Sequence, residues 1–218
     1  MESQARRASL GADAPRQLPL ALDILERVAL VLFYSFMSWS FLTSWVETGS
    51  LATLIVLASE GTVLAFVLIR RRTSDISLNT TDWLLAFAGT VLPMLVRPVA
   101  DGGLVPIFAC IPIMLIGFGL QISAKLTLRR SFGVVPANRG VKASGPYRFC
   151  RHPMYAGYVM TQVGFLLINP SLWNVLIYAC ALAIQIGRIL AEERLLSKDE
   201  AYRRFIVAVP YRLIPLVF

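Results

Sequence analysis

Long apolar runs constrain this chain more than any other feature of its sequence. Residues 28–46 and 104–124 contain 19 and 21 amino acids without a charged side chain, and residues 51–69 contain 19 with one. A helix needs about 20 such residues to cross the hydrocarbon core of a bilayer. Of the 218 residues 56% are hydrophobic and 16% are charged, whereas about a quarter are charged in soluble proteins. The sequence therefore predicts a helical membrane protein rather than a soluble globule.

Three further apolar segments extend this bundle. Residues 83–100 form a predicted fourth span that carries an internal proline. Residues 155–168 and 172–187 flank Asn169-Pro170-Ser171, a turn sequence that predicts a helical hairpin. We expect an all-α fold, a polytopic membrane bundle of about six transmembrane helices.

The net charge of +8 indicates orientation rather than nucleic-acid binding. A nucleic-acid-binding protein spreads its basic residues along polar surface, whereas here they flank the apolar runs. If the N-terminus is cytoplasmic, six spans place 20 of the 21 Lys and Arg residues on that side, leaving Arg97 on the other. We expect a multi-pass protein with both termini cytoplasmic, in a bacterial inner membrane or an equivalent membrane. The expected partners are membrane lipids, with no nucleic acid and no required protein partner.

One long cytoplasmic loop, residues 129–155, concentrates glycine, proline and cations. Such a long loop in a compact protein is usually functional. It contains His152, the single histidine of the sequence, directly before Pro153. Proline is favoured at the first position of a helix, where free backbone N–H groups attract an anion. Headgroup contacts are the alternative role for cations beside a span. We favour a functional His152 because Tyr147, Arg151 and Tyr155 crowd the same helix start.

A second polar cluster follows the last span. Residues 188–204 contain no Gly or Pro, so the helix is expected to continue into the cytoplasm. Arg188 and Glu192 are four residues apart and share one face. A solvated salt bridge explains the pair by itself. The hairpin, however, returns Arg188 to the side of His152, which predicts one cytoplasmic cavity lined by a carboxylate, a guanidinium and an imidazole.

Glu60 is a carboxylate near the middle of the second span, where an ionised group is costly. It can line a substrate path. It can equally be protonated or hydrogen-bonded to a neighbouring helix, and the sequence leaves both readings open.

Two motifs then resemble a known family. Gly145-Pro-Tyr-Arg-Phe-Cys-Arg-His-Pro-Met-Tyr-Ala-Gly157, followed by Arg188-x-x-x-Glu192-Glu193-x-x-Leu196 and then by residues 202–210, resembles the isoprenylcysteine carboxyl methyltransferases and their phospholipid methyltransferase relatives. The likeness covers residues 129–218. It implies a division into a disordered tail (1–22), variable transmembrane helices 1–4 (23–128), and a methyltransferase core (129–218). The core holds a cofactor loop, the hairpin and a cytoplasmic C-terminal helix.

The resemblance also implies a cofactor and a site. S-adenosylmethionine would occupy a cytoplasmic pocket of the bundle, and a lipophilic acceptor would enter from the bilayer. The backbone of residues 139–142 would close over the cofactor, and Arg139 stands where prenylcysteine members usually show a His. The residues implied for cofactor binding are Val141, Lys142, Tyr147, His152, Pro153, Met154, Tyr155 and Glu192. The residues implied for catalysis are Arg188, which would face the acceptor, together with Glu192 and Arg151.

The cofactor chemistry needs few protein groups. A methyl on a sulfonium is already activated, so transfer requires an aligned acceptor and a dry site. A carboxylate acceptor suits the fixed donors of Arg188, and we expect a carboxylate of the isoprenylcysteine type. An amine of a phospholipid or a small thiol would need a base, with Glu192, Glu193 or His152 as candidates.

Other classes of protein compete with a methyltransferase. A sterol-type membrane reductase would use NADPH, and a small transporter or structural membrane protein would use the loop only for headgroup contacts. The chain lacks the Gly-x-Gly-x-x-Gly of soluble nucleotide-binding folds. Gly117 and Gly119 lie within a span, where they are expected to serve close helix packing. No metal site is expected, because the cysteines lack metal-ligand spacing.

Overall fold

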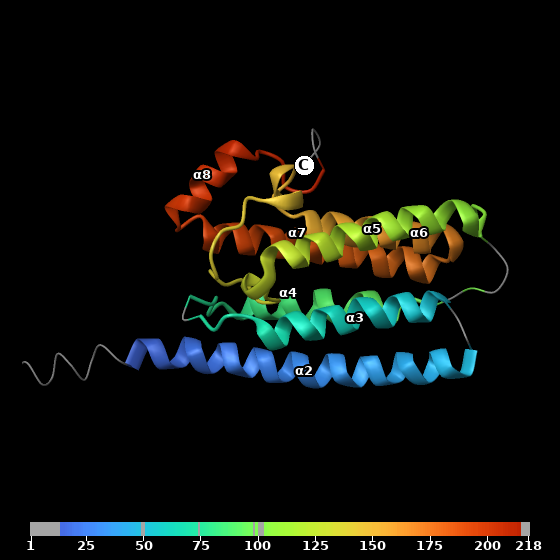
Figure 1. Ribbon diagram of the computed structural model, residues 1–218, viewed down its shortest axis with the longest axis horizontal. Helices are drawn as coiled ribbons and strands as arrows, with labels where there is room; N and C mark the ends of the chain where they lie inside the picture. Colours follow the sequence, from blue (N-terminus) through green and yellow to red (C-terminus); the bar gives the residue numbers. More distant parts are fainter. Residues whose placement is uncertain (1–13, 49–50, 74, 98, 100–102, 215–218) are drawn as a thin grey trace, which may run out of the picture. The chain divides into compact units, whose positions relative to one another are not determined.

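The computed structural model describes residues 14–48, 51–73, 75–97, 99 and 103–214. These residues form α-helices and short 3₁₀ turns (Figure 1), so the predicted all-α class is confirmed. The chain divides into two compact units, the first made of residues 1–78 and 129–140 and the second of residues 79–128 and 141–218. The first unit contains α2 (Ala14–Thr48), α3 (Leu51–Ile69) and the turn η2 (Arg129–Ser131). The second contains α4 (Thr80–Val91), η1 (Leu92–Leu95), α5 (Ile107–Leu128), η3 (Gly145–Arg148), α6 (Pro153–Ile168), α7 (Leu172–Leu196) and α8 (Glu200–Ala208).

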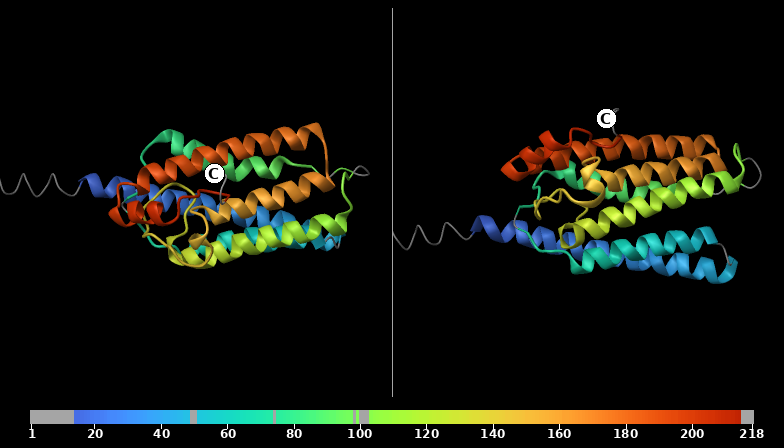
Figure 2. Two further views of the ribbon diagram at one scale, coloured as in Figure 1. Left: turned by 90° about the horizontal axis from the view of Figure 1, so that it is seen from above. Right: turned by 45° about the horizontal axis from the view of Figure 1, so that its top comes forward.

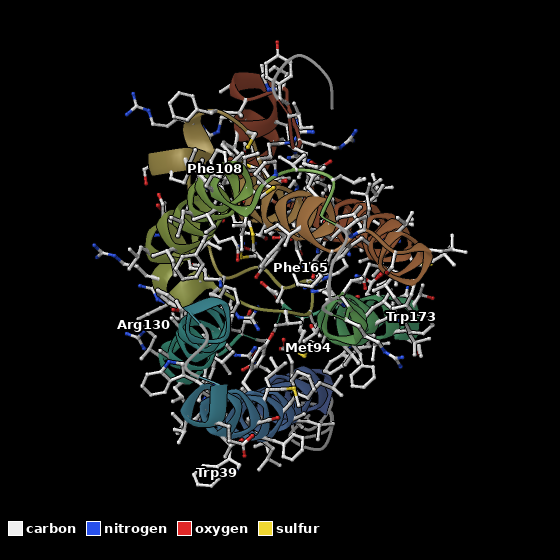
Figure 3. The ribbon with its side chains drawn as sticks, turned by 90° about the vertical axis from the view of Figure 1, so that its right-hand side faces the viewer. Trp39, Met94, Phe108, Arg130, Phe165 and Trp173 are labelled. Carbon is white, nitrogen blue, oxygen red and sulfur yellow. The ribbon has the colours of Figure 1, made fainter. Side chains whose placement is uncertain are left out.

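In the first unit, α2 and α3 lie side by side (Figures 1 and 2). Helix α2 exposes large apolar side chains, among them Phe36 and Trp39, each 67% exposed, and Trp39 points away from α3 (Figure 3). An exposed apolar face of this kind is typical of a surface that contacts a membrane or another protein. The helix begins at Ala14, so residues 14–22 are helical although the sequence predicts them in a disordered tail. Residues 1–13 lie outside the described part of the chain.

A buried cluster of four charges holds the N-terminal half of α2 in place. Arg70, which follows α3, lies 3.3 Å from Asp23 and 2.9 Å from Glu26. Arg139 lies 2.7 Å from Asp23, and two consecutive backbone N–H groups of its loop donate to Glu26 at 3.1 and 2.9 Å. Two carboxylates and two guanidiniums thus compensate one another away from water, as buried charges require. The cluster, which we call the four-charge cluster, ties the N-terminal half of α2 to the end of α3 and to the 131–139 loop.

In the second unit, α5 and α6 lie side by side (Figure 2), and they pack closely through glycine. A Cβ atom on Gly117 would lie 2.8 Å from the carbonyl oxygen of Gly157, so only hydrogen fits between the two backbones. The close packing predicted for Gly117 is therefore confirmed. A Cβ on Gly119 would meet nothing within 4 Å among the described atoms, so Gly119 does not serve this purpose.

The hairpin predicted around Asn169-Pro170-Ser171 is confirmed, because α6 ends and α7 begins on either side of it. The buried Asn174 side chain donates to the carbonyl oxygens of Asn169 (2.9 Å) and Arg97 (2.8 Å), and accepts the Arg97 N–H at 2.9 Å. The Arg97 guanidinium lies 5.2 Å from the centroid of the Trp173 ring. The indole N–H of Trp173, labelled in Figure 3, donates to the carbonyl oxygen of Leu95 at 2.8 Å. These contacts fix the turn to the segment after η1.

The helix expected over residues 83–100 is shorter than predicted. Helix α4 ends at Val91, and Pro93 lies in the 3₁₀ turn that follows, since proline cannot continue the hydrogen-bond ladder of a helix. Among the described residues, two stretches are long and apolar enough to cross a membrane, Ile107–Ser131 and Leu172–Leu196. The six predicted spans therefore stay a prediction. The side chain of Glu60 lies outside the described part.

Candidate functional site

The start of α6 has the geometry that the His152-Pro153 sequence predicts. His152 is the residue before the first turn, and Pro153 occupies the first helical position. The C-terminal segment holds this start in place, because the N–H groups of Arg151 and His152 donate to the carbonyl oxygens of Tyr211 (2.9 Å) and Arg212 (2.8 Å). Residues 211 and 212 are thus part of the site's framework.

Glu193 on α7 is the centre of the polar cluster. Its Oε1 atom accepts from Nε of Arg151 at 2.7 Å and lies 3.3 Å from Nε2 of His152, while its Oε2 accepts from Nε of Arg212 at 2.8 Å. Arg151 also donates to the carbonyl oxygens of Val209 and Pro210, both at 3.1 Å. The family resemblance implied a catalytic role for Arg151. In the structure its hydrogen bonds instead join the start of α6 to α7 and to the C-terminal segment.

The neighbouring carboxylate has a different environment. The Glu192 side chain is 37% exposed, whereas that of Glu193 is 9% exposed. Oε2 of Glu192 lies 4.0 Å from Nδ1 of His152, so the imidazole lies between the two carboxylates. Glu193 is saturated with protein donors, and Glu192 keeps capacity for a ligand.

Arg188 lies one turn before Glu192 and is buried. Its guanidinium carbon is 5.3 Å from the centroid of the Tyr155 ring, a cation–π distance. The Tyr155 ring lies 5.8 Å from the His152 ring, which connects the two polar groups. The Arg188 side chain also lies against Gly89 of α4, where a Cβ atom would lie 2.9 Å from Cδ of Arg188. The absent side chain of Gly89 gives Arg188 its room.

The sequence interpretation assigned no role to three contributing residues. Gln185 is a buried amide whose Oε1 has no hydrogen-bond partner among the described residues, and it lies three positions before Arg188 on α7, where side chains are neighbours. The buried hydroxyl of Tyr202 on α8 likewise has no hydrogen-bond partner in the described part. Arg212 completes the Glu193 cluster. A polar amide inside an apolar run was a detectable signal for Gln185. Tyr202 begins the segment 202–210 of the family resemblance, which assigned it no role, and Arg212 carries no local signal.

Burial keeps the phenols and the thiol near the site uncharged. Burial, and next the Glu192 carboxylate, raise the pKa of Tyr147 well above its usual range, and the same two causes raise the pKa of Tyr202. Burial also raises the pKa of the Cys150 thiol, against a smaller opposing effect of a backbone hydrogen bond with His152. The phenols are therefore neutral donors, and Cys150 is not a nucleophile at neutral pH.

The structure brings most of the predicted site residues together. Tyr147, His152, Pro153, Met154 and Tyr155 are all buried around the start of α6. Lys142 is exposed and Val141 half-buried. No hydrogen bond or ion pair joins these two to the Glu193 cluster within the part of the chain that the structure describes. No group of three or more His, Cys, Asp and Glu side chains in that part could hold a metal ion.

These residues fit S-adenosylmethionine. A sulfonium with an amino group carries positive charge, which suits the partly open Glu192 and the faces of Tyr147 and Tyr155. The cofactor also carries polar groups, and the buried Tyr202 hydroxyl is a donor without a protein partner in the described part. A buried hydroxyl of this kind is costly unless a ligand or water satisfies it.

Comparison with known proteins supports this interpretation. The described residues combine a buried polar cluster with two stretches that are long and apolar enough to cross a bilayer. Residues 106–203, which run from the start of α5 into α8, match the model of the phospholipid methyltransferase family, so this segment belongs to that family. Members of that family are S-adenosylmethionine-dependent methyltransferases that act on lipids. A search of curated proteins found no match to the chain.

Proposed function

We propose that the protein transfers a methyl group to the carboxylate of a lipophilic acceptor, of the isoprenylcysteine type, which enters from the bilayer. One observation carries the choice of acceptor. Of the three candidate bases, Glu193 accepts from Arg151 and Arg212, His152 lies beside it at 3.3 Å, and Glu192 would pair with the positive charge of the cofactor. An acceptor that is already deprotonated needs none of them.

The cofactor would lie at the start of α6. When bound, S-adenosylmethionine supplies an activated methyl on a sulfonium. Tyr147, His152 and the first turn of α6 would bind it, with Val141 and Lys142 in the loop that precedes η3. Glu192 would pair with its positive charge, because its carboxylate is the one that the protein leaves partly open.

Arg188 would orient the acceptor. Its planar guanidinium can hold a carboxylate through two parallel hydrogen bonds, and stacking on Tyr155 limits its motion. The apolar surroundings would exclude water and strengthen that interaction. The amide of Gln185, one turn earlier on α7, would provide a further hydrogen bond to the acceptor.

A phospholipid amine is the second candidate, because the matching family is described as phospholipid methyltransferase. An ammonium must lose a proton before it can accept a methyl group. Glu192 would then have to serve as the base, since Glu193 is saturated.

The experiment is methyl transfer from labelled S-adenosylmethionine by the full chain in nanodiscs. An S-prenylated cysteine with a free carboxylate is compared with its carboxamide and with phosphatidylethanolamine. We expect label on the carboxylate that alkali releases as methanol, since esters hydrolyse and N-methyl groups do not. Alkali-stable label on phosphatidylethanolamine alone would overturn the carboxylate proposal.

We further propose six spans with both termini in the cytoplasm, which puts 20 of the 21 Lys and Arg residues on one side. The apolar lengths of α3, α5 and α7 support this proposal. Membrane-impermeant thiol labelling tests it with cysteines introduced at Gly103 and Arg204. We expect opposite accessibility for the two positions, and equal accessibility would contradict the topology.

A further inference from the structure

An open pocket at the C-terminal end of α3 lies within the first unit. Its volume is about 720 Å³. It shares no residue with the Glu193 cluster or its surroundings. It is lined by Arg27, Leu68, Ile69, Arg70, Arg71, Arg72 and Arg130. Five of the seven lining residues are arginines and none is acidic, which makes it a site of concentrated positive charge.

The nearby carboxylates do not neutralise this charge. Asp23 and Glu26 belong to the four-charge cluster, where they compensate Arg70 and Arg139. No carboxylate of the described residues lies within ion-pair distance of the remaining four arginines of the pocket. The carboxylates of the four-charge cluster therefore compensate Arg70, and the positive charges of the other four arginines remain for a ligand.

Main-chain contacts hold two of these arginines in place. Arg27 donates through Nη2 to the carbonyl oxygen of Arg70 at 2.7 Å, and Arg130 donates through Nε to that of Ile69 at 3.3 Å. Arg130 thus lies beside α3 (Figure 3), and the N–H of Arg71 donates to its carbonyl oxygen at 2.7 Å. Cations at a helix C-terminus are favourable in themselves. That role uses one N–H group of each arginine and leaves the other donors of each guanidinium for a ligand.

The positive-inside preference explains why this side of the protein carries many arginines. It does not explain why the arginines gather at one pocket. The positive-inside preference depends on how many cations a loop carries. Here cations from α2, from the loop after α3 and from η2 meet at one hollow. Guanidiniums match phosphate oxygens in shape and charge.

The rest of the pocket indicates where such a phosphate comes from. Leu68 and Ile69 are 54% and 53% exposed and form its apolar part. They are the last residues of the apolar helix α3, and the topology proposed above puts them where a span meets the headgroup region. A ligand that carries a phosphate beside an acyl chain contacts both parts of the pocket, whereas free phosphate contacts one.

We propose that this arginine pocket binds the phosphate of an anionic phospholipid, at a site separate in sequence and composition from the methyl-transfer site. The lipid would anchor the cytoplasmic end of the α2–α3 pair. Its binding does not depend on which acceptor is methylated.

The test measures lipids retained by the full chain after purification in detergent, by native mass spectrometry, with added phosphatidylglycerol or phosphatidylcholine. The variant is Arg71→Gln/Arg72→Gln, because both side chains are exposed and lie outside the four-charge cluster. The control is Arg203→Gln/Arg204→Gln, two exposed cations of α8, which removes the same charge elsewhere. Thermal unfolding checks that both variants fold.

We expect the Arg71/Arg72 variant to lose phosphatidylglycerol retention by about twenty-fivefold, which is about fivefold for each of the two charges. The α8 control and phosphatidylcholine retention should not change. Equal losses in the two variants would overturn the pocket, because they would reflect overall charge. Titration with inorganic phosphate distinguishes the source: binding of phosphate with no preference for phosphatidylglycerol over phosphatidylcholine would overturn a lipid ligand.

Discussion

The two units each bury a cluster of carboxylates and guanidiniums, and the clusters differ in how far their outer side chains are exposed to solvent. In the first unit, Asp23, Glu26, Arg70 and Arg139 balance one another, with side chains no more than 3% exposed. In the second unit, the cluster opens gradually toward solvent. Its centre is the buried Glu193, and its edges are Arg212 and Glu192, with side chains 35% and 37% exposed.

This difference separates a structural cluster from one that can take a ligand. A closed cluster with equal numbers of opposite charges has no capacity left for a further ion. An open cluster keeps groups whose charge is only partly compensated, as Glu192 is. The same residue types therefore have different roles, and the environment rather than the side chain decides between them.

The largest effect is expected for Glu193→Ala. The change leaves Arg151 and His152 buried beside each other without the carboxylate, and breaking a buried ion pair in this way costs about 3 to 5 kcal/mol. We expect the second unit to lose much of its stability and all methyl transfer. Thermal unfolding in detergent, followed by binding of S-adenosylmethionine to any folded fraction, measures both. Full stability with lost binding would instead make Glu193 a ligand-contacting residue.

Glu192→Gln should affect binding and leave stability unchanged. The amide keeps the shape but cannot pair with the positive charge of the cofactor. We expect cofactor affinity to fall by about tenfold to a hundredfold, as for a lost hydrogen bond to a charged group, with an unchanged unfolding temperature. Isothermal titration with S-adenosylmethionine is the measurement. An unchanged affinity would remove Glu192 from the proposed cofactor site.

Substitutions of Arg139 test the role of the four-charge cluster. Arg139→Gln leaves Asp23 with Arg70 alone and should cost about 3 kcal/mol of stability, whereas Arg139→Lys should restore part of it. The first unit's unfolding, followed by hydrogen exchange at α2, reports the change. If Arg139→Gln folded as well as the parent chain and lost only cofactor affinity, the residue would belong to the cofactor loop instead.

The sequence predicted the second unit's site better than the first unit's. The His152-Pro153 helix start, the hairpin and the closeness of His152 to Glu192 depend on local signals, namely a proline, a turn sequence and a helical spacing. The four-charge cluster joins residues 23 and 139, and no local pattern links positions so far apart. The sequence also could not show which of Glu192 and Glu193 is buried. Adjacent residues on a helix point in different directions, and only the packing of the helix decides which side chain faces the interior.

Two glycines extend the comparison between the units. A Cβ atom on Gly89 would meet Cδ of Arg188 at 2.9 Å and Nη1 at 3.0 Å, whereas one on Gly61 of α3 would meet nothing within 4 Å. The arginine side chain is flexible, so Gly89→Ala should displace Arg188 at little cost in stability. We expect the acceptor KM to rise or kcat to fall by about tenfold, with cofactor affinity unchanged. Gly61→Ala is the matched control and should leave activity as it is. Equal effects of the two substitutions would show a general effect of packing.

The smallest effect is expected for Gln185→Leu. The leucine has nearly the same volume, and the Oε1 atom that it removes has no hydrogen-bond partner among the described residues. A structural role therefore predicts unchanged or improved stability, since a buried polar group without a partner is unfavourable. If the amide binds the acceptor, KM for the acceptor should rise about fivefold, as for one neutral hydrogen bond, while the affinity for S-adenosylmethionine stays constant. Steady-state kinetics at varied acceptor and at varied cofactor separate the two constants. A change confined to the cofactor constant would place Gln185 on the other side of the proposed site, with Glu192 rather than with Arg188.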